Sequence, residues 1–174
     1  HGYAGTSIRD IAADAGVQFR FGTEATAVLV DHNQVRGVRL SGDGSTDDLA
    51  ADAVVLAAGI DSLDLAAPFG IRLPMVPVKG YSITVQVANH AALPRHAMQD
   101  ATRKVTLTPL GDRLRIAGTA ELAGRDTRIN RRRADTLLAA LPTLLPDATW
   151  KGDPEYWCGL RPMTADSLPI LGAT

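Results

Sequence analysis

The sequence has 174 residues, a length that fits one domain or one domain with part of a second. Hydrophobic residues make up 45% of it and charged residues 21%, so it contains enough apolar material for a folded core. The 18 basic and 19 acidic side chains give a net charge of −1, which argues against a nucleic-acid partner. The single cysteine excludes an intrachain disulfide, and no apolar run reaches the ~18 residues of a membrane-spanning helix. We expect the chain to be part of a longer protein.

Short local patterns predict the elements of the first 50 residues. A helix is predicted over residues 6–15, because Thr6 or Ser7 can cap its free amides. Alternating or apolar runs predict four strands, with hairpin turns at residues 31–33 and 41–45. The predicted strands cover residues 17–21, 25–30, 35–40 and 47–49.

Residues 53–58 differ from these strands because they are apolar without alternation. This pattern predicts a strand that is buried on both faces, as in a parallel sheet. The run ends at Ala57, Ala58 and Gly59, which carry little or no side chain. Ligands of open α/β sheets bind at the carboxyl ends of the strands, so small residues at this end leave space for one.

The sequence pattern of the second half of the chain predicts an antiparallel sheet with helices. A helix is predicted over residues 129–141, with Asn130 as its cap and Pro142 as its end. A shorter helix is predicted over residues 62–69. The predicted strands cover residues 81–87, 105–108, 114–117 and 155–159.

Motifs of the common hydrolase, zinc-protease and nucleotide-binding classes do not occur in the sequence. The four histidines have no metal-ligand spacing, so we predict no metal site. A cluster of five arginines between residues 125 and 133 has two interpretations. It binds an anion or lipid headgroups, or it forms a solvated helix start that Asp126 and Asp135 balance.

Arg161 is a candidate binding residue near the end of the chain. It is followed by Pro162 and preceded by the aromatic Trp157, so its guanidinium is a candidate clamp for a carboxylate. The alternative is a structural ion pair with Asp153 or Asp166, and the spacing does not decide between them.

Three blocks of sequence resemble a known family. They are residues 15–25 with 35–38, residues 51–59 leading to 77–82, and residues 156–166 followed by 169–172. Together they resemble the FAD-dependent amine oxidoreductases of the D-amino-acid oxidase and glycine oxidase type, and most closely the bacterial D-amino-acid dehydrogenase small subunits.

The resemblance implies a fold of the α+β or α/β class, with part of a Rossmann-like FAD-binding domain and an antiparallel substrate domain. Residues 1–78 would belong to the FAD-binding domain and residues 79–158 to the substrate domain. Residues 159–174 would return toward the FAD-binding domain.

The resemblance also implies roles for single residues. Contacts with FAD would come from the backbone at Ala25, from Ala58 and Gly59, and from Gly159 under the flavin. Arg161 would bind the substrate carboxylate. Tyr81 would line the substrate pocket, or it would be a buried tyrosine of the sheet. No side chain is assigned as a catalytic base, because the cofactor carries the redox step.

The implied reaction is the oxidative deamination of a D-amino acid to a 2-oxo acid and ammonia by hydride transfer to FAD. We expect a cytoplasmic enzyme, with peripheral association with the inner membrane and a respiratory-chain electron acceptor as further expectations. The alternatives are a glycine- or sarcosine-type amine oxidase and a cofactor-free module that binds carboxylates. The sequence lacks the family's G-x-G-x-x-G turn, so we expect this chain alone to bind FAD weakly or not at all and to be inactive.

Overall fold

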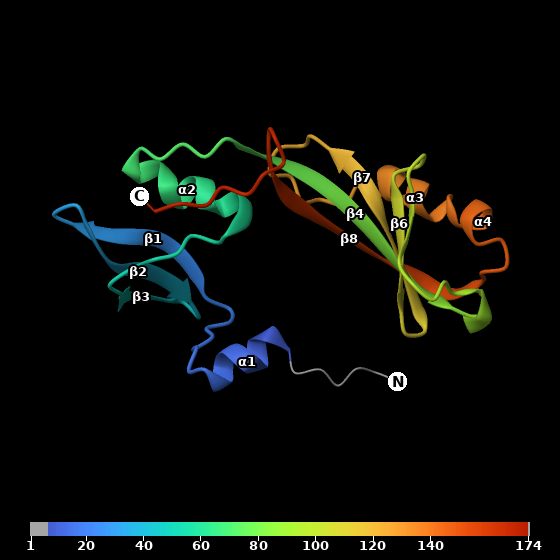
Figure 1. Ribbon diagram of the computed structural model, residues 1–174, viewed down its shortest axis with the longest axis horizontal. Helices are drawn as coiled ribbons and strands as arrows, with labels where there is room; N and C mark the ends of the chain where they lie inside the picture. Colours follow the sequence, from blue (N-terminus) through green and yellow to red (C-terminus); the bar gives the residue numbers. More distant parts are fainter. Residues whose placement is uncertain (1–6, 174) are drawn as a thin grey trace. The chain divides into compact units, whose positions relative to one another are not determined.

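The computed structural model describes residues 7–173, which form two compact units that divide at Ala57 (Figure 1). The first unit contains helix α1 (Ile8–Asp14) and an antiparallel sheet with the strand order β1-β2-β3. Helix α1 starts in a capping box, in which Asp10 N donates to Ser7 Oγ and Ser7 N donates to the Asp10 carboxylate. The predicted helix and its Ser7 cap are confirmed, and Thr6, the other predicted cap, lies outside the described residues.

Two tight turns define the sheet of the first unit. Its strands are β1 (Glu24–Asp31), β2 (Gln34–Gly42) and β3 (Ser45–Ala50). His32 and Asn33 have φ values of 48° and 60°, and Asp43 and Gly44 have φ values of 49° and 75°. Positive φ at both central residues is typical of the two-residue turns whose twist suits a hairpin. Both predicted hairpins are therefore confirmed.

Two predicted strands are wrong. Residues 17–21 are irregular and end in a turn, although the rings of Phe19 and Phe21 stack with centroids 6.0 Å apart. Residues 53–58 are also irregular, and Val55 is 88% exposed. The physical reason is the same in both cases. A strand needs a neighbouring strand for its hydrogen bonds, and within residues 7–173 neither segment has one.

The second unit begins with short helices and continues into an antiparallel sheet. The elements η1 (Gly59–Asp61), α2 (Ser62–Ala66) and η2 (Ala67–Phe69) confirm the predicted short helix. The sheet has the order β5-β6-β7-β4-β8, and the 3-10 turn η3 (His90–Ala92) follows β4 (Figure 1). Its strands are β4 (Met75–Val87), β5 (Met98–Asp100), β6 (Val105–Leu110), β7 (Arg113–Glu121) and β8 (Trp150–Thr164). The predicted strands of this half are confirmed, and β4 and β8 are longer than expected.

Helices α3 (Arg131–Leu138) and α4 (Leu141–Leu144) cover one face of this sheet and enclose the core. Asn130 caps α3, because its side-chain oxygen accepts a hydrogen bond from Arg133 N, as predicted. The buried core side chains are Tyr81, Ile83, Val85, Val87, Val105, Leu107, Leu114, Ile116, Ala134, Leu137 and Leu141.

The prediction of one helix over residues 129–141 with Pro142 as its end is wrong. Helix α3 ends at Leu138, and Pro142 lies in the first turn of α4. Proline suits this position because the amides of a first turn need no acceptor within the helix.

The predicted domain boundaries fall inside strands. The one between residues 78 and 79 lies within β4, and the one between residues 158 and 159 lies within β8. The assignment of these segments to FAD-binding and substrate domains stays a prediction. Among residues 7–173, no helix has both the length and the apolar character to cross a membrane.

Candidate active site

One face of the sheet in the second unit carries no packed helix from the part of the chain that the structure describes. Strands β4 and β8 pair antiparallel, with Gly80 opposite Gly159 and Val78 opposite Arg161. Because side chains alternate along a strand, these residues lie on the same face, and the core residues between them lie on the other. Helices α3 and α4 pack on that core face, so the face with Arg161 is open.

Arg161 is exposed and points across β4. Its Nη1 atom donates to the carbonyl oxygen of Thr119 on β7 at 3.3 Å. A Cβ atom built on Gly80 would lie 2.6 Å from Arg161 Cζ, so the guanidinium lies directly over the backbone of Gly80.

The alternative interpretation of Arg161, a structural ion pair, is not formed within the described residues. Neither Asp153 nor Asp166 lies within ion-pair distance of it, and Asp166 accepts a hydrogen bond from Leu168 N at 3.1 Å instead. A guanidinium has five N–H donors, and one of those of Arg161 bonds to Thr119. The others remain available for a carboxylate, which matches the fork of a guanidinium.

Trp157 covers Gly159. A Cβ atom on Gly159 would lie 2.8 Å from Trp157 Cζ2, so the indole takes the space above this glycine. The indole is 62% exposed and lies on the same face as Arg161. On the open face, the Trp157 indole therefore lies two residues before Gly159 and the Arg161 guanidinium lies two residues after it. The role of Gly159 under a flavin stays a prediction.

Ala58 and Gly59 lie in the turn that begins the second unit. Ala58 N donates to Ser62 Oγ at 3.1 Å, and Gly59 has a φ of 59°. A Cβ on Gly59 would lie 3.9 Å from Pro162 Cγ, so the turn lies beside the residue that follows Arg161. The structure thus brings Ala58, Gly59 and Arg161 to one end of β8.

Ala25 belongs to the first unit. It is exposed on β1, where it pairs with Leu40. It lines a shallow hollow of about 250 Å3 together with Gln18, Arg20, Thr23, Leu40 and Leu49. Its contact with the adenine of FAD stays a prediction.

Tyr81 lies on the core face, opposite to the face of Arg161. It is 1% exposed, and its hydroxyl donates to Glu121 at 2.5 Å. This environment is that of a buried sheet tyrosine, the alternative considered from the sequence. Its role in lining a substrate pocket stays a prediction.

A charged network that sequence reasoning missed surrounds Tyr81. Buried Lys79 donates to the carbonyl oxygen of Arg128 and lies 5.5 Å from the Tyr81 ring centroid. Glu121 also pairs with Arg133 on α3 at 3.1 Å. The network ties the sheet to the start of α3, and the spacing of these residues along the chain gave no signal of it.

The network shifts the acidities of its members. Burial, together with the hydrogen bond to Glu121, raises the pKa of Tyr81 above its ordinary value. Burial alone would lower the pKa of Lys79, but its interaction with Tyr81 and the carboxylates of Asp126 and Glu121 raises it overall. The phenol and the ammonium therefore keep their protons at neutral pH.

The arginine cluster is largely paired with protein groups. Arg128 binds Asp126 at 2.9 Å, and this contact lowers the pKa of Asp126 to about 2. The other pairs are Arg125 with Asp61 and Asp64, Arg133 with Glu121, and Arg131 over the Tyr156 ring. Asp135 accepts a hydrogen bond from the Tyr156 hydroxyl rather than balancing an arginine. The structure thus favours the solvated helix start, with Asp126 as one balancing residue.

Residues 7–173 contain no group of three or more His, Cys, Asp or Glu side chains placed to hold a metal ion. The polar and aromatic groups of the open face are the Arg161 guanidinium, which lies over Gly80, and the Trp157 indole, which lies over Gly159.

Comparison with known proteins places this geometry in a family. The chain is 46% identical to the D-amino acid dehydrogenase of Paramagnetospirillum magneticum over 164 residues, which are 94% of this chain and 38% of that protein. It is 41% identical to the D-amino acid dehydrogenase of Xanthobacter autotrophicus over 168 residues, which are 97% of this chain and 39% of that protein. The chain thus spans about two fifths of the length of these relatives.

The fold agrees with the sequence comparison. The crystal structure of glycine oxidase from Geobacillus kaustophilus matches 94% of this chain and 42% of its own, with a TM-score of 0.73 and 32% identity. Residues 6–174 match the family described as DAO, FAD dependent oxidoreductase. The predicted resemblance and fold class are confirmed, and the chain belongs to the DAO family of FAD-dependent oxidoreductases.

Proposed function

We propose that this chain forms the substrate-binding part, with a portion of the FAD-binding part, of an enzyme that oxidatively deaminates D-amino acids. The observation that carries the proposal is the Arg161 guanidinium, which lies on the open sheet face without a carboxylate partner among the described residues. The 39–46% identity to D-amino acid dehydrogenases supports a D-amino acid as its ligand.

Free space beside the backbone is found at Gly59, where the nearest neighbour of an added Cβ would be Pro162 Cγ at 3.9 Å. The space above Gly80 holds the Arg161 guanidinium and the space above Gly159 holds the Trp157 indole, so a flat cofactor would meet these two planar groups. Ala58, Gly59 and Gly159 would hold FAD, with Ala25 contributing from the first unit. When bound, FAD would supply the hydride acceptor for the substrate α carbon.

The residues of this chain would bind the substrate and orient it. Arg161 would hold the substrate carboxylate by two parallel hydrogen bonds, which fixes the rotation of the α carbon beside it. The Trp157 indole would exclude water from one side of the substrate. We assign no side chain as a base.

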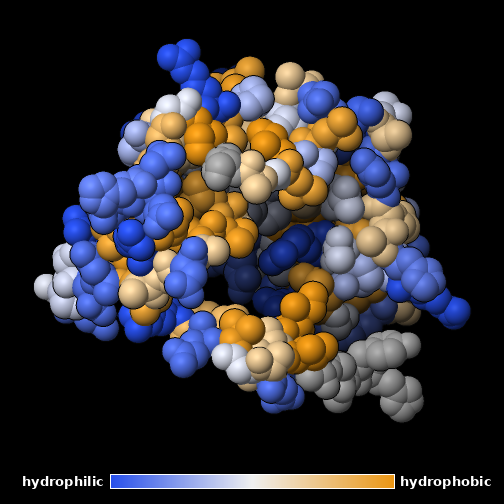
Figure 2. All heavy atoms as spheres, turned by 60° about the vertical axis from the view of Figure 1, so that its left-hand side comes forward, coloured by the Kyte–Doolittle hydropathy of each residue, from blue (hydrophilic) through white to orange (hydrophobic). Residues whose placement is uncertain are grey.

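Exposed apolar residues support a larger assembly around this chain. Val55 is 88% exposed, Ile8 is 87% exposed and Leu171 is 88% exposed. Figure 2 shows apolar residues at the surface among hydrophilic ones. Exposed apolar areas mark surfaces that other protein covers, and we propose that further strands of an FAD-binding domain cover residues 53–58.

A glycine- or sarcosine-type amine oxidase is the second candidate, and the similarity to glycine oxidase favours it. The two are separated by comparing D-alanine with glycine as substrate, and dye reduction with peroxide release. For the D-amino acid dehydrogenase we propose a cytoplasmic location, peripheral association with the inner membrane and a respiratory-chain electron acceptor. The relatives are named as dehydrogenases, and this name is the support for the proposed electron acceptor.

The test is the substitution Arg161→Ala in the complete enzyme that contains this chain. Loss of charge-assisted hydrogen bonds worth about 3 kcal/mol should lower kcat/KM for D-alanine by roughly 100-fold, mainly through KM. Arg132→Ala is the matched control, because Arg132 is an exposed arginine on α3. An unchanged KM in Arg161→Ala would refute the assignment. Calorimetric binding of D-alanine by the chain without FAD would favour a cofactor-free module instead.

A further inference from the structure

The strand pairing changes register beside Arg161. Strand β4 pairs with β7 so that Lys79 lies opposite Glu121 and Tyr81 lies opposite Gly118. One residue of β4, Gly80, therefore faces two residues of β7, Thr119 and Ala120. This two-against-one count is a β-bulge, and such bulges re-aim groups next to binding sites.

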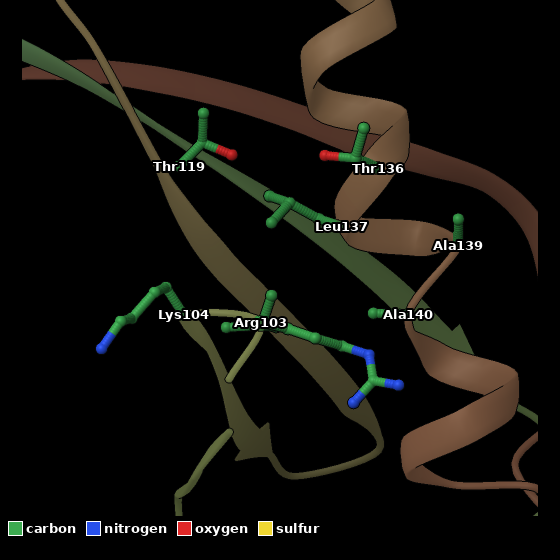
Figure 3. A pocket seen from close by; sticks show the side chains of 8 residues that line it. Arg103, Lys104, Thr119, Thr136, Leu137, Ala139 and Ala140 are labelled. Atoms are coloured by element: carbon green, nitrogen blue, oxygen red, sulfur yellow. The ribbon is translucent and has the colours of Figure 1, made fainter. Parts of the chain in front are cut away.

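Thr119 holds an unusual backbone conformation in this bulge. Its φ is 65°, in the left-handed region that a β-branched residue rarely enters. Its side chain lies on the α3 side of the sheet, where it lines a hollow with Thr136 and Leu137 (Figure 3). Its carbonyl oxygen accepts the hydrogen bond from Arg161 Nη1. The strained residue thus presents its carbonyl to the guanidinium on the open face.

Gly80 lies under the guanidinium of Arg161. The guanidinium lies over it so closely that any side chain at this position would displace Arg161. The position of the Arg161 side chain is therefore set by two contacts. Gly80 leaves room for the guanidinium because it has no side chain, and the carbonyl oxygen of Thr119 accepts a hydrogen bond from it.

We propose that Thr119 and Gly80 are positioning residues for Arg161, and that the bulge sets the orientation in which the guanidinium meets a carboxylate. This inference rests on the proposed role of Arg161 as the carboxylate-binding group. It assigns a function to a strained position that the binding role of Arg161 alone does not explain, since strain of this kind persists only where the surrounding structure holds it.

The substitutions Thr119→Gly and Thr119→Asn separate positioning from structural support. Both residues enter the left-handed region more easily than threonine, so neither should lower the urea midpoint of unfolding. Glycine loosens the bulge, and we expect KM for D-alanine to rise about ten- to hundredfold while kcat changes less than about threefold. Asparagine keeps a side chain in the bulge, and we expect it to retain a KM near that of the wild type.

Gly80→Ala tests whether the guanidinium of Arg161 needs a residue without a side chain beneath it, and Gly172→Ala is the control. A Cβ on Gly172 would meet nothing within 4 Å. We expect a raised KM in Gly80→Ala only. If the buried alanine at residue 80 prevents folding, the pair of Thr119 variants decides.

A second measurement uses the complete enzyme that contains this chain, without substrate. The Nε–Hε signal of Arg161, identified by its loss in Arg161→Lys, reports the order of the guanidinium through its heteronuclear NOE. We expect an ordered signal in the wild type and a mobile one in Thr119→Gly. Equal order in the two would overturn the inference.

The activity measurements distinguish this inference from the proposed function. A raised KM in Arg161→Ala together with unchanged KM values in Thr119→Gly and Gly80→Ala would overturn the positioning role alone. An unchanged KM in Arg161→Ala would overturn both.

Discussion

Helix α3 is held on the sheet by Leu137, and its truncation should unfold the second unit more easily. Leu137 is 2% exposed, and a Cβ added to Gly118 would lie 2.9 Å from its Cδ2 atom. Figure 3 shows its side chain reaching from α3 toward β7. The ion pair between Arg133 and Glu121 also joins the start of α3 to β7, and it opposes a shift of the helix into the space that Leu137→Ala would leave.

The size of the effect follows from this packing. Leu→Ala substitutions in cores cost about 2–5 kcal/mol, and where a shift of the helix is opposed we expect about 3 kcal/mol or more. With an m-value of about 2 kcal/mol/M, the urea midpoint should fall by roughly 1.5 M.

Tryptophan fluorescence measures this unit specifically, because Trp150 and Trp157 both lie in β8. Leu122→Ala is the matched control, since Leu122 is 81% exposed and its truncation should cost less than about 0.5 kcal/mol. Equal midpoints for Leu137→Ala and Leu122→Ala would refute the packing argument.

Three further predictions concern single polar groups. The hydrogen bonds from Arg128 lower the pKa of Asp126 from 3.8 to about 2, so the ionised carboxylate stabilises the fold above about pH 4 and this contribution is lost as the pH falls toward 2. Urea midpoints measured over this pH range should therefore vary less in Asp126→Asn, and superimposable curves would contradict the assignment. Tyr81→Phe removes the donor to Glu121 and should lower the free energy of unfolding by about 1–2 kcal/mol without changing KM for D-alanine; a raised KM would show that Tyr81 reaches the substrate. Asn33→Gly suits the φ of 60° at this turn and should stabilise the hairpin by about 0.5 kcal/mol, seen as a higher thermal midpoint by circular dichroism, whereas a lower midpoint would contradict it.

Elements that depend on neighbouring residues in the chain could be predicted from the sequence. Ser7 caps α1 and Asn130 caps α3, because the side-chain oxygen bonds an amide three residues along the same chain. The turn at residues 31–33 is equally local, since its positive φ values need only residues that tolerate them.

Elements that depend on distant partners could not be predicted in this way. Residues 53–58 have the composition of a buried strand, but composition does not supply the neighbouring strands that would cover and bond it. Pro142 shows a different limit. A proline ends a helix or begins one, and the choice depends on whether α3 has already stopped at Leu138.

The candidate site was partly accessible from the sequence. Arg161 stands out because an arginine before a proline and near a tryptophan is a pattern with a chemical use. The bulge at Thr119 leaves no such mark, since it depends on the register between two strands about 40 residues apart.

The alternation of β4 explains why three consecutive residues divide between two roles. Lys79 and Tyr81 point into the core face, where their polar groups are buried and bonded to Arg128 and Glu121. Gly80 lies between them on the open face, under the guanidinium of Arg161. Because a strand turns successive residues to opposite faces, the charged network of Lys79 and Tyr81 and the contact of Gly80 with Arg161 can share one stretch of backbone.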